Sequence, residues 1–292
     1  MTIFVSKIMN APIPHASAAG LERSCVPAAG DWIRQAPPSP GLERIDAGFT
    51  GHAYDPHRHD TYAIGYTLNG VQCFRYRGAD AVSTAGNVLV IHPDEVHDGH
   101  AGTEAGFRYR MLYVEPLLVQ EALGERRRSL PFVRTPVFTD PHLVSCLIAA
   151  LDDFDRPLDE LLADQVVAAL SEGLARREGG APKPSRMPEA ALRRARDYLE
   201  DNAARTVGSE ELEKISGLER YQLARQFRLF FGTSPYRYLV MRRLARARAL
   251  IAGGTDLATA AFDAGFADQS HLTRHFKQAF GITPGRWARL LV

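Results

Sequence analysis

The spacing of apolar positions divides the chain into a strand-rich half followed by a helical half. Across residues 45–114, short runs of β-type residues alternate with turn residues, and no helical pattern separates them. Two of these runs, 62–68 and 71–76, flank Asn69 and Gly70. Both of these residue types tolerate the positive φ of a tight turn, so the stretch predicts a β-hairpin. Many short strands of this kind favour a sandwich or a barrel.

Two further strands are predicted at 86–91 and 109–114, and helical periodicity begins after them. A short helix is expected over 116–123 and longer ones over 141–154 and 157–177, because apolar residues recur there at three- and four-residue intervals. These helices are the candidate dimer face. The apolar positions of the two longer helices are Leu143, Leu147, Ala150, Leu151, Leu158, Leu161, Leu162, Val166, Ala169 and Leu170.

The C-terminal half begins with an amphipathic helix over 189–202 and then contains one pattern twice. A shift of 49 residues brings Leu223, Arg225, Phe227, Gly232 and Pro235 onto Leu272, Arg274, Phe276, Gly281 and Pro284. In each copy a short helix leads to a glycine and then to a longer helix. Leu223 and Phe227, like Leu272 and Phe276, are four residues apart and share one helix face, which we expect to be buried. Two helices joined by a glycine turn, the second with a polar outer face, predict a helix-turn-helix unit.

One continuous helix over 236–251 is expected to join the two units. At ~1.5 Å per residue it spans roughly 24 Å. With the offsets of the two recognition helices added, these helices come about 34 Å apart, which is one turn of DNA. The phosphate-holding candidates on the joining helix are Arg242, Arg243, Arg246 and Arg248.

The distribution of charge along the chain indicates a partner for the helical half. The whole chain carries +1, but residues 186–292 hold 18 Lys and Arg against 11 Asp and Glu, whereas residues 1–185 hold 17 against 23. The basic half suits a polyanion such as double-stranded DNA. Cys25, Cys73 and Cys146 are too few and too widely spaced for a disulfide or metal framework. No apolar run approaches the ~18 residues of a membrane span, and with no export signal a cytoplasmic location is expected.

The duplicated motif resembles the DNA-binding domain of the AraC/XylS family of bacterial transcription regulators, and the resemblance covers residues 189–292. It implies binding to operator DNA, RNA polymerase as a partner, and no enzymatic activity. Activation of transcription is the expected mode, although the sequence does not fix activator versus repressor, and the candidate dimer face predicts a homodimer. Glu213 and Glu219 depart from the family pattern, which usually has Ala at the first position and often Ser or another cap at the second. The matching positions are Gly217, Leu223, Arg225, Phe227, Gly232, Pro235, Tyr238, Leu239, Arg243, Leu244, Ala247, Ala261, Gly265, Phe266, His271, Arg274, Phe276, Lys277, Gly281 and Pro284.

The resemblance also implies which side chains contact bases. The corresponding positions are Tyr221 and Arg225 in the first unit, and Gln269, Ser270, His271 and Arg274 in the second. Arg220 lies on an outer face of the first recognition helix and is a further DNA-binding candidate. Arg225 and Arg274 are expected to pair with guanine, and Gln269 with adenine.

A second motif lies in the strand-rich half, where His57 and His59 precede a predicted strand and His97 follows later. This spacing resembles the two motifs of cupin barrels. In metal-binding cupins a His-x-His pair, a Glu and a later His hold one ion. Here Ala63 and Ile64 occupy the positions at which the Glu would fall, so a complete metal site is not expected.

Three roles are open for these histidines. They form a ligand pocket in which His57, His59 and His97 donate hydrogen bonds, or they are structural at the mouth of the barrel, or they hold a metal such as Fe, Zn, Ni or Cu. Four tyrosines either line this pocket or are simple core or surface aromatics: Tyr62, Tyr66, Tyr76 and Tyr109. No cofactor and no bound metal is predicted.

Together these patterns predict an α+β chain of two domains. A flexible leader is expected at 1–40, a cupin-like effector-sensing and dimerisation domain at 41–177, a linker at 178–188, and an all-α domain with two helix-turn-helix units at 189–292. The predicted function is sequence-specific transcription regulation controlled by a small-molecule effector. The alternatives are a cupin metalloenzyme with an attached helical domain and a regulator whose barrel only dimerises.

Overall fold

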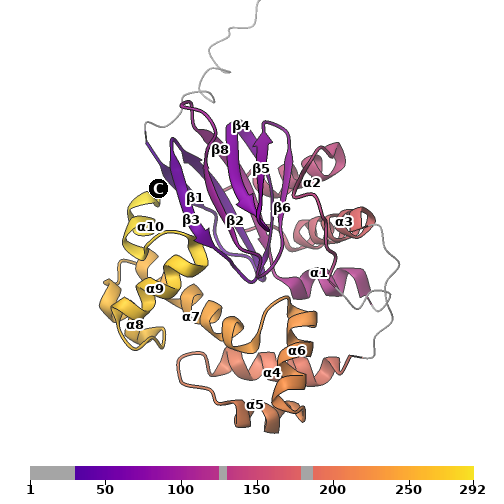
Figure 1. Cartoon of the computed structure of the whole chain (residues 1–292), viewed down its shortest axis with the longest axis vertical. Helices are drawn as coiled ribbons and strands as arrows, with labels where there is room; N and C mark the ends of the chain where they lie inside the picture. The colour runs from indigo at the N-terminus through magenta and orange to yellow at the C-terminus, as the bar shows by residue number, and fades with distance from the viewer. Residues whose placement is uncertain (1–29, 125–129, 179–186) are drawn as a thin grey trace, which may run out of the picture.

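The computed structural model describes residues 30–124, 130–178 and 187–292. The strands are β1 (Trp32–Gln35), β2 (Leu42–Phe49), β3 (His52–His57), β4 (Tyr62–Tyr76), β5 (Ala79–Thr84), β6 (Val88–Ile91), β7 (His97–Ala101), β8 (Phe107–Val114) and β9 (Val137–Phe138). The helices are α1 (Pro116–Leu123), α2 (Pro141–Leu151), α3 (Glu160–Glu178), α4 (Glu189–Asp201), α5 (Ser209–Ser216), α6 (Arg220–Phe231), α7 (Pro235–Ala252), α8 (Leu257–Asp263), α9 (Gln269–Phe280) and α10 (Pro284–Leu290). The strands lie between α1–α3 on one side and α8–α10 on the other, with α4–α6 below (Figure 1).

Two antiparallel layers share strand β4. One layer has the order β1-β2-β8-β4-β6-β9, and in the other β3 pairs with β7 while β7 and β5 pair with β4. Alternation along β4 buries Phe74 and Tyr76, and it leaves Arg75 between them exposed. The two layers together form the predicted cupin-like barrel.

The predicted hairpin at Asn69 and Gly70 is wrong, because β4 runs unbroken through both residues. Strand β8 pairs with both halves of β4, and the register shifts between Thr67 and Asn69. Gly70 has a φ of 72°, and a Cβ at this position would collide with the carbonyl oxygen of Gly106. The Asn-Gly pair therefore makes a bulge that carries one long strand from the first layer into the second.

The predicted irregular leader is wrong at its C-terminal end. Residues 1–29 lie outside the described part of the chain, but Trp32–Gln35 forms β1, an edge strand paired with β2. Ile33 is buried, and the guanidinium of Arg108 lies 5.3 Å from the ring centroid of Trp32. One buried aliphatic and one stacked aromatic anchor this strand, although proline-rich sequence follows it.

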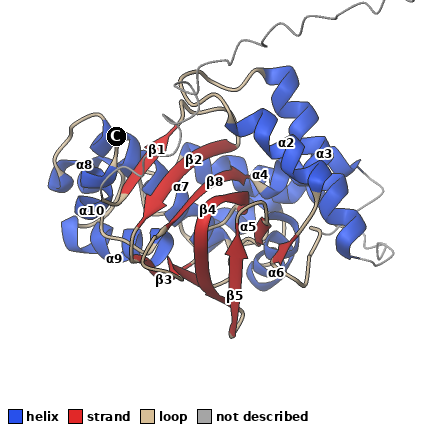
Figure 2. Ribbon diagram, turned by 90° about the horizontal axis from the view of Figure 1, so that it is seen from above, coloured by secondary structure: helices blue, strands red, loops and turns tan. Residues whose placement is uncertain are grey.

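Helices α1, α2 and α3 confirm the helices predicted after the last strand of the barrel, and they cover one face of the first layer (Figure 2). Helix α2 begins after Asp140, whose carboxylate accepts hydrogen bonds from two N–H groups of the first turn. The apolar residues of α2 and α3 share a buried cluster with Ile64 and Leu112 of the barrel. Leu161, one of the apolar positions of this predicted helix, is 79% exposed on α3.

The C-terminal helices have two separate cores. Helices α4, α5 and α6 and the start of α7 enclose a cluster that includes Leu192, Leu223 and Phe227. The rest of α7, with α8, α9 and α10, belongs to the same buried cluster as the barrel interior, in which Phe276 and Trp287 join barrel residues. The second helix-turn-helix unit is therefore packed directly onto the barrel.

The fold class is the predicted one, an α+β chain with a strand-rich N-terminal part and a helical C-terminal part. The predicted linker at 178–188 lies mostly outside the described residues, so the domain limits stay a prediction. Within the described ranges no helix has both the length and the hydropathy to cross a bilayer.

Candidate nucleic-acid interface and ligand cavity

Local sequence determines where the first recognition helix begins. Helix α5 ends at Gly217, whose φ of 72° is left-handed. Helix α6 begins after Glu219, whose carboxylate accepts hydrogen bonds from two N–H groups of the first turn. Glu213 accepts a hydrogen bond from the N–H of Arg220 at 2.7 Å. The two acidic residues that depart from the family pattern therefore cap this helix, where negative charge also suits the helix dipole.

The second unit uses the same devices. Asp268 caps α9 by accepting a hydrogen bond from the N–H of His271 at 2.7 Å. Gly265, between α8 and α9, has a φ of 87°, and a Cβ there would lie 2.7 Å from the carbonyl oxygen of Ala204. Gly281 ends α9 with a φ of 70°. The sequence repeat is therefore a structural repeat, with glycine at the positions that a side chain would strain.

Most of the predicted base-contacting side chains lie on exposed faces of α6 and α9. On α6, Leu223 and Phe227 are buried while Tyr221 is 77% exposed. On α9 the buried pair is Leu272 and Phe276. These outer faces carry the donors and acceptors that read base edges in a major groove, and the base contacts themselves stay a prediction. The exposed candidates are Arg220, Tyr221, Arg225, Gln269, Ser270 and Arg274.

His271 differs from the other predicted readers because it is half-buried. The N–H of Ala267 donates to its Nδ1 at 3.3 Å, so the proton of the neutral ring is on Nε2. That atom lies 2.9 Å from Nε2 of His275, whose pKa burial lowers to about 4. His271 therefore donates to a neutral neighbour on its own helix and has less freedom than the other readers to contact a base.

Strand β3 of the barrel holds the C-terminal end of α9. The N–H of Asp55 donates to the carbonyl of Gly281 at 2.9 Å, and the N–H of Arg58 donates to a carbonyl of the last turn of α9 at 3.2 Å. The Asp55 carboxylate pairs with Lys277 at 2.7 Å, and this contact lowers the pKa of Asp55. Pro56 forms one wall of a shallow cleft whose other wall is the outer face of α9. The barrel therefore borders a recognition helix.

The prediction that the α7 arginines hold phosphates is wrong for three of the four, and two of these three pair with carboxylates. Arg242 pairs with Asp60 at 3.0 Å and with Glu115 at 2.8 Å. Arg248 pairs with Glu43 at 2.5 Å. All three carboxylates belong to the barrel part of the chain. Because α7 lies between the barrel and helices α4–α6, these arginines face protein and not solvent (Figure 1).

The remaining basic residues of this region are also largely engaged. Arg243 donates to two backbone carbonyls at 2.7 Å, so it too is unavailable, and Arg246 is exposed as predicted. Asp94, whose side chain is 5% exposed, lies 2.8 Å from Arg228 of α6 and 2.8 Å from Arg237 of α7. The first unit is therefore also tied to the barrel, through one buried carboxylate.

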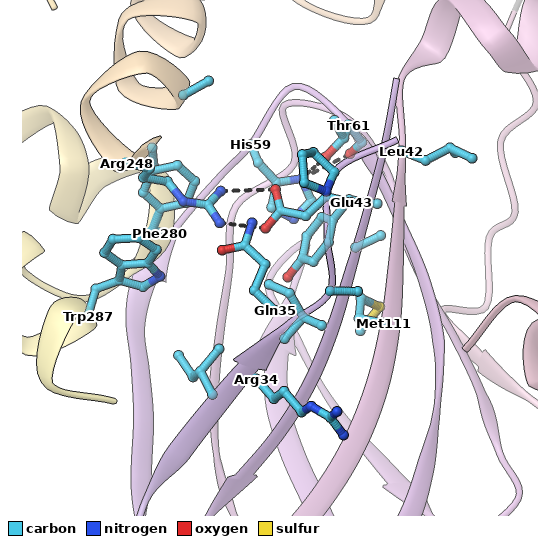
Figure 3. A pocket seen from close by; sticks show the side chains of 18 of the residues that line it. Arg34, Gln35, Leu42, Glu43, His59, Thr61, Met111, Arg248, Phe280 and Trp287 are labelled. Atoms are coloured by element: carbon cyan, nitrogen blue, oxygen red, sulfur yellow. Dashed lines mark hydrogen bonds and ion pairs between the residues drawn. The ribbon is translucent and has the colours of Figure 1, made fainter. Parts of the chain in front are cut away.

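A cavity of about 880 Å³ lies where the barrel interior meets α7, α9 and α10. Figure 3 shows Arg248, Phe280 and Trp287 of the helical part facing Glu43 and Met111 of the barrel. The guanidinium of Arg248 lies 4.9 Å and 5.2 Å from the ring centroids of Phe280 and Trp287. This volume is typical of a small-molecule site. The sequence did not indicate that these three residues line a cavity, because it does not say which faces of α7, α9 and α10 meet the barrel.

The three predicted histidines converge on this cavity. The ring centroid of His97 lies 4.1 Å from that of His57 and 4.9 Å from that of His59. The Nδ1 atom of each ring lies 2.8 to 3.1 Å from a backbone carbonyl oxygen two residues away. A carbonyl oxygen can only accept, so each Nδ1 carries the proton and each Nε2 is a bare acceptor.

Burial keeps these imidazoles neutral. Burial first, and neighbouring histidines second, lower the pKa of His57 and of His59 well below the usual value, and burial lowers the pKa of His97 to about 4. The prediction that these rings donate hydrogen bonds to a ligand is therefore wrong. Each ring donates to the backbone and offers a ligand an acceptor. The buried Nε2 of His59 has no hydrogen-bond partner in the described part of the chain.

Tyr62 and Tyr76 do not line this cavity, which corrects the prediction for both. The hydroxyl of Tyr62 donates to the carbonyl of Pro131 at 2.8 Å, within the cluster beneath α2 and α3. The hydroxyl of Tyr76 lies 2.8 Å from Nδ1 of His92, which is buried outside the cavity wall. Tyr66 also lies outside the wall, whereas Tyr109 lines it as predicted, together with Tyr54 and Tyr113.

The chemistry of the wall favours hydrogen bonding over metal binding. Within the described ranges no group of three or more His, Cys, Asp or Glu side chains has the arrangement to hold a metal ion. Ala63, at one position where a cupin glutamate would fall, lines the cavity without a ligand atom. What the site offers a small molecule is three acceptor nitrogens in an otherwise largely apolar space.

Known proteins match both halves of the chain. A family model described as an AraC-like ligand binding domain matches residues 39–171, and one described as a helix-turn-helix domain matches residues 212–290. The uncharacterized HTH-type transcriptional regulator YbfI of Bacillus subtilis is 26% identical over 220 residues, 74% of this chain and 80% of that protein. The HTH-type transcriptional activator RhaS of Escherichia fergusonii is 26% identical over 246 residues, 80% of this chain and 86% of that protein.

A solved structure shares the arrangement of both halves. ToxT from Vibrio cholerae, with an unsaturated fatty acid bound, aligns with a TM-score of 0.62 at 13% identity. The alignment covers 86% of this chain and 95% of ToxT. At this identity the likeness shows the fold, a strand-rich domain followed by a helical one.

Proposed function

This chain belongs to the AraC/XylS family of bacterial transcription regulators, and we propose how its recognition helices and its cavity divide the work. It is a DNA-binding regulator with an N-terminal ligand-binding domain. The observation that carries the proposal is the pair of helix-turn-helix units. In both, one face of the recognition helix is buried in the core while the polar face is exposed.

We assign sequence recognition to the exposed faces of α6 and α9. Arg225 and Arg274 suit bidentate pairing with guanine, and Gln269 suits adenine. The continuous helix α7 between the two units supports the placement of both readers in successive major grooves. The full set of assigned residues is Arg220, Tyr221 and Arg225 in the first unit, and Gln269, Ser270, His271 and Arg274 in the second.

The cavity is the proposed effector site. Its wall comes from the barrel and from α7, α9 and α10, so a molecule that fills it contacts both halves of the chain. The ToxT structure contains a fatty acid, which supports small-molecule control for a chain of this fold. His57, His59 and His97 are the proposed contacts for the polar end of the effector.

Strand β3 is the proposed link between the cavity and DNA. His57 lines the cavity, whereas Asp55 and Pro56, just before it, contact α9. The pairing with Asp55 also withholds Lys277 from phosphate. We propose that this docked arrangement restricts α9, and that an effector touching His57 changes the population of the docked form.

The proposed dimer face is formed by α2 and α3, where Ile148 and Leu161 are 44% and 79% exposed. RNA polymerase is the proposed partner in activation, and a chromosomal target gives a cytoplasmic location. The metalloenzyme alternative is weakened by the missing glutamate and by the absence of a metal-holding group in the described ranges. A barrel that only dimerises leaves the cavity unexplained.

Binding of the full chain to its own upstream DNA, and to a scrambled duplex of equal composition at the same salt, tests the DNA-binding half of this proposal. Equal affinity for both duplexes would remove sequence-specific recognition. A thermal-shift screen with small metabolites tests the effector half. A metabolite that raises Tm without changing DNA affinity would leave the barrel without control over the readers.

A further inference from the structure

The three histidines at the polar end of the cavity present hydrogen-bond acceptors only. His57, His59 and His97 are 8%, 4% and 9% exposed, and the N–H of each ring donates a hydrogen bond to a backbone carbonyl oxygen. Among the described residues none donates a hydrogen bond to an Nε2 atom of these rings, and the Nε2 of His59 is fully buried. A bare acceptor in a buried site carries a free-energy cost until a donor reaches it. This end of the cavity therefore suits a group that brings its own N–H or O–H.

The cations of the wall are already neutralised. The described wall contains three arginines and no lysine. Arg248 donates two hydrogen bonds to the Glu43 carboxylate at 2.9 and 2.5 Å, Arg242 pairs with two carboxylates, and Arg34 pairs with one at 2.5 Å. An entering carboxylate therefore meets no unpaired guanidinium. It has to displace a partner of Arg242 or Arg248, or accept only from neutral donors such as the tyrosine hydroxyls of the wall, and its charge is costly beside three acceptor nitrogens in a buried site. The carboxylates of the wall are Glu43, Asp60, Asp98, Glu115 and Asp155.

Most of the remaining wall is apolar, although tyrosines and Gln72 also line it. On the barrel side it contains Ile45, Phe74 and Met111, and on the helical side Phe280 and Trp287. With about 880 Å³ available, an apolar body fits next to the histidines. Burial of that body provides affinity, while the acceptors at the polar end select the head group.

We infer that this cavity takes an effector with a hydrogen-bond-donating head, a hydroxyl or an ammonium group, on an apolar body, and that it discriminates against the matching carboxylate. The head lies against Nε2 of His57, His59 and His97. The body lies against Phe280 and Trp287. This inference rests on the proposed role of the cavity as the effector site. It assigns this chain a ligand of a charge type different from the fatty acid in the ToxT structure.

Calorimetric titration of the full chain at neutral pH with 1-decanol, decylamine and decanoate, which share one chain length, tests the inference. We expect decanol or decylamine to bind at least about tenfold more tightly than decanoate, because one hydrogen bond to a buried acceptor contributes about that factor. Tighter binding of decanol assigns a neutral hydroxyl head. Tighter binding of decylamine assigns an ammonium drawn by the carboxylates of the wall. Equal or tighter binding of decanoate, or no binding of either donor ligand, overturns the inference.

Variants of His59 locate the head group. His59→Leu removes the acceptor and should weaken the donor ligands about tenfold while leaving decanoate unchanged. His59→Gln keeps an acceptor oxygen near the position of Nε2 and should retain most of the affinity. His92→Gln is the matched control, because His92 is a buried histidine outside the cavity wall. The Tm of each variant checks folding, and an unchanged preference in a folded His59→Leu overturns the inference.

Two more measurements separate this inference from the function on which it rests. If chelator treatment abolishes binding of all three ligands, the acceptors hold a metal and the inference is overturned. DNA affinity is measured on the same samples. If decanoate binds best and changes DNA affinity, the head-group inference fails and the effector site stands. If decanol or decylamine binds best without changing DNA affinity, the effector function fails and the binding chemistry stands.

Discussion

Replacement of Gly281 by alanine tests whether strand β3 holds the second recognition helix. Gly281 ends α9 with a φ of 70°, and a Cβ there would lie 2.6 Å from the carbonyl oxygen of Asp55 and 2.8 Å from Nδ1 of His57. Gly217 is the matched control, because it ends α5 with a φ of 72° and has no atom within 4 Å of the same Cβ position. Both variants therefore impose the same left-handed strain, and only Gly281→Ala adds a collision with the barrel.

The size of the effect follows from these contacts. Left-handed strain costs roughly 1–2 kcal/mol for alanine and is common to both variants. The collision involves backbone and a buried ring, so β3 has to move away, at a cost of about 1–3 kcal/mol. Lys277 and Asp55 are 51% and 39% exposed, so their ion pair adds little. Gly281→Ala should therefore lose about 1–3 kcal/mol more free energy of unfolding than Gly217→Ala.

Urea unfolding and amide hydrogen exchange measure this difference. The N–H groups of Asp55 and Arg58 donate to carbonyls at the end of α9, so their exchange should accelerate in Gly281→Ala and stay unchanged in Gly217→Ala. DNA affinity without effector should rise in Gly281→Ala only, because α9 is released. Equal unfolding and equal exchange in the two variants would refute the account of β3 as the holder of α9.

Three further predictions follow from the readers, the ion pairs and the buried histidines. Arg274→Ala should cost ~1–3 kcal/mol of binding free energy on the preferred site and relax specificity at one base pair. Arg176→Ala on α3 is the control and should change neither. An unaltered sequence preference of Arg274→Ala in a competition assay would show that Arg274 does not read a base. Asparagine at position 94 tolerates the left-handed φ of 61°, so Asp94→Asn mainly removes the charge that faces Arg228 and Arg237. The free energy of unfolding in urea at low salt should fall by about 1–3 kcal/mol. An unchanged free energy of unfolding would contradict the tie between the first helix-turn-helix unit and the barrel. Burial lowers the pKa of His92 from 6.5 to about 4, so the unfolded chain binds the proton first as pH falls. The free energy of unfolding should therefore decline between about pH 6.5 and 4, by at most about 3 kcal/mol from this residue, and a His92→Gln variant with the same slope would contradict that assignment.

The helical half was predictable because its signals are local. Leu223 and Phe227 fix one buried face, Gly217 fixes the turn, and the repeat 49 residues later shows that the pattern is a unit. These residues determine which helix face is buried and which is exposed within each unit, whatever that unit packs against. The resemblance to the family indicated the reader candidates, and all of them except the half-buried His271 are exposed.

The sequence could not give features that depend on distant neighbours. Asn69 and Gly70 have hairpin chemistry, but pairing of β8 with both halves of β4 turns the same residues into a bulge. Arg242 and Arg248 have the charge for phosphates, but carboxylates from the barrel meet them because α7 is enclosed. The histidine positions were predictable and their hydrogen-bonding direction was not, since it depends on which carbonyl each Nδ1 meets.

Selection of preferred sites from a random DNA pool by the full chain tests whether α6 and α9 read DNA together. We expect one sequence with two conserved boxes whose centres lie about 10 base pairs apart, the spacing of successive major grooves on one side of the duplex. Arg274→Ala should relax one position in one box only, and Arg225→Ala one position in the other. A single box, two boxes without fixed spacing, or recovery of the pool without enrichment would contradict the claim that α6 and α9 read DNA as two fixed helices of one chain.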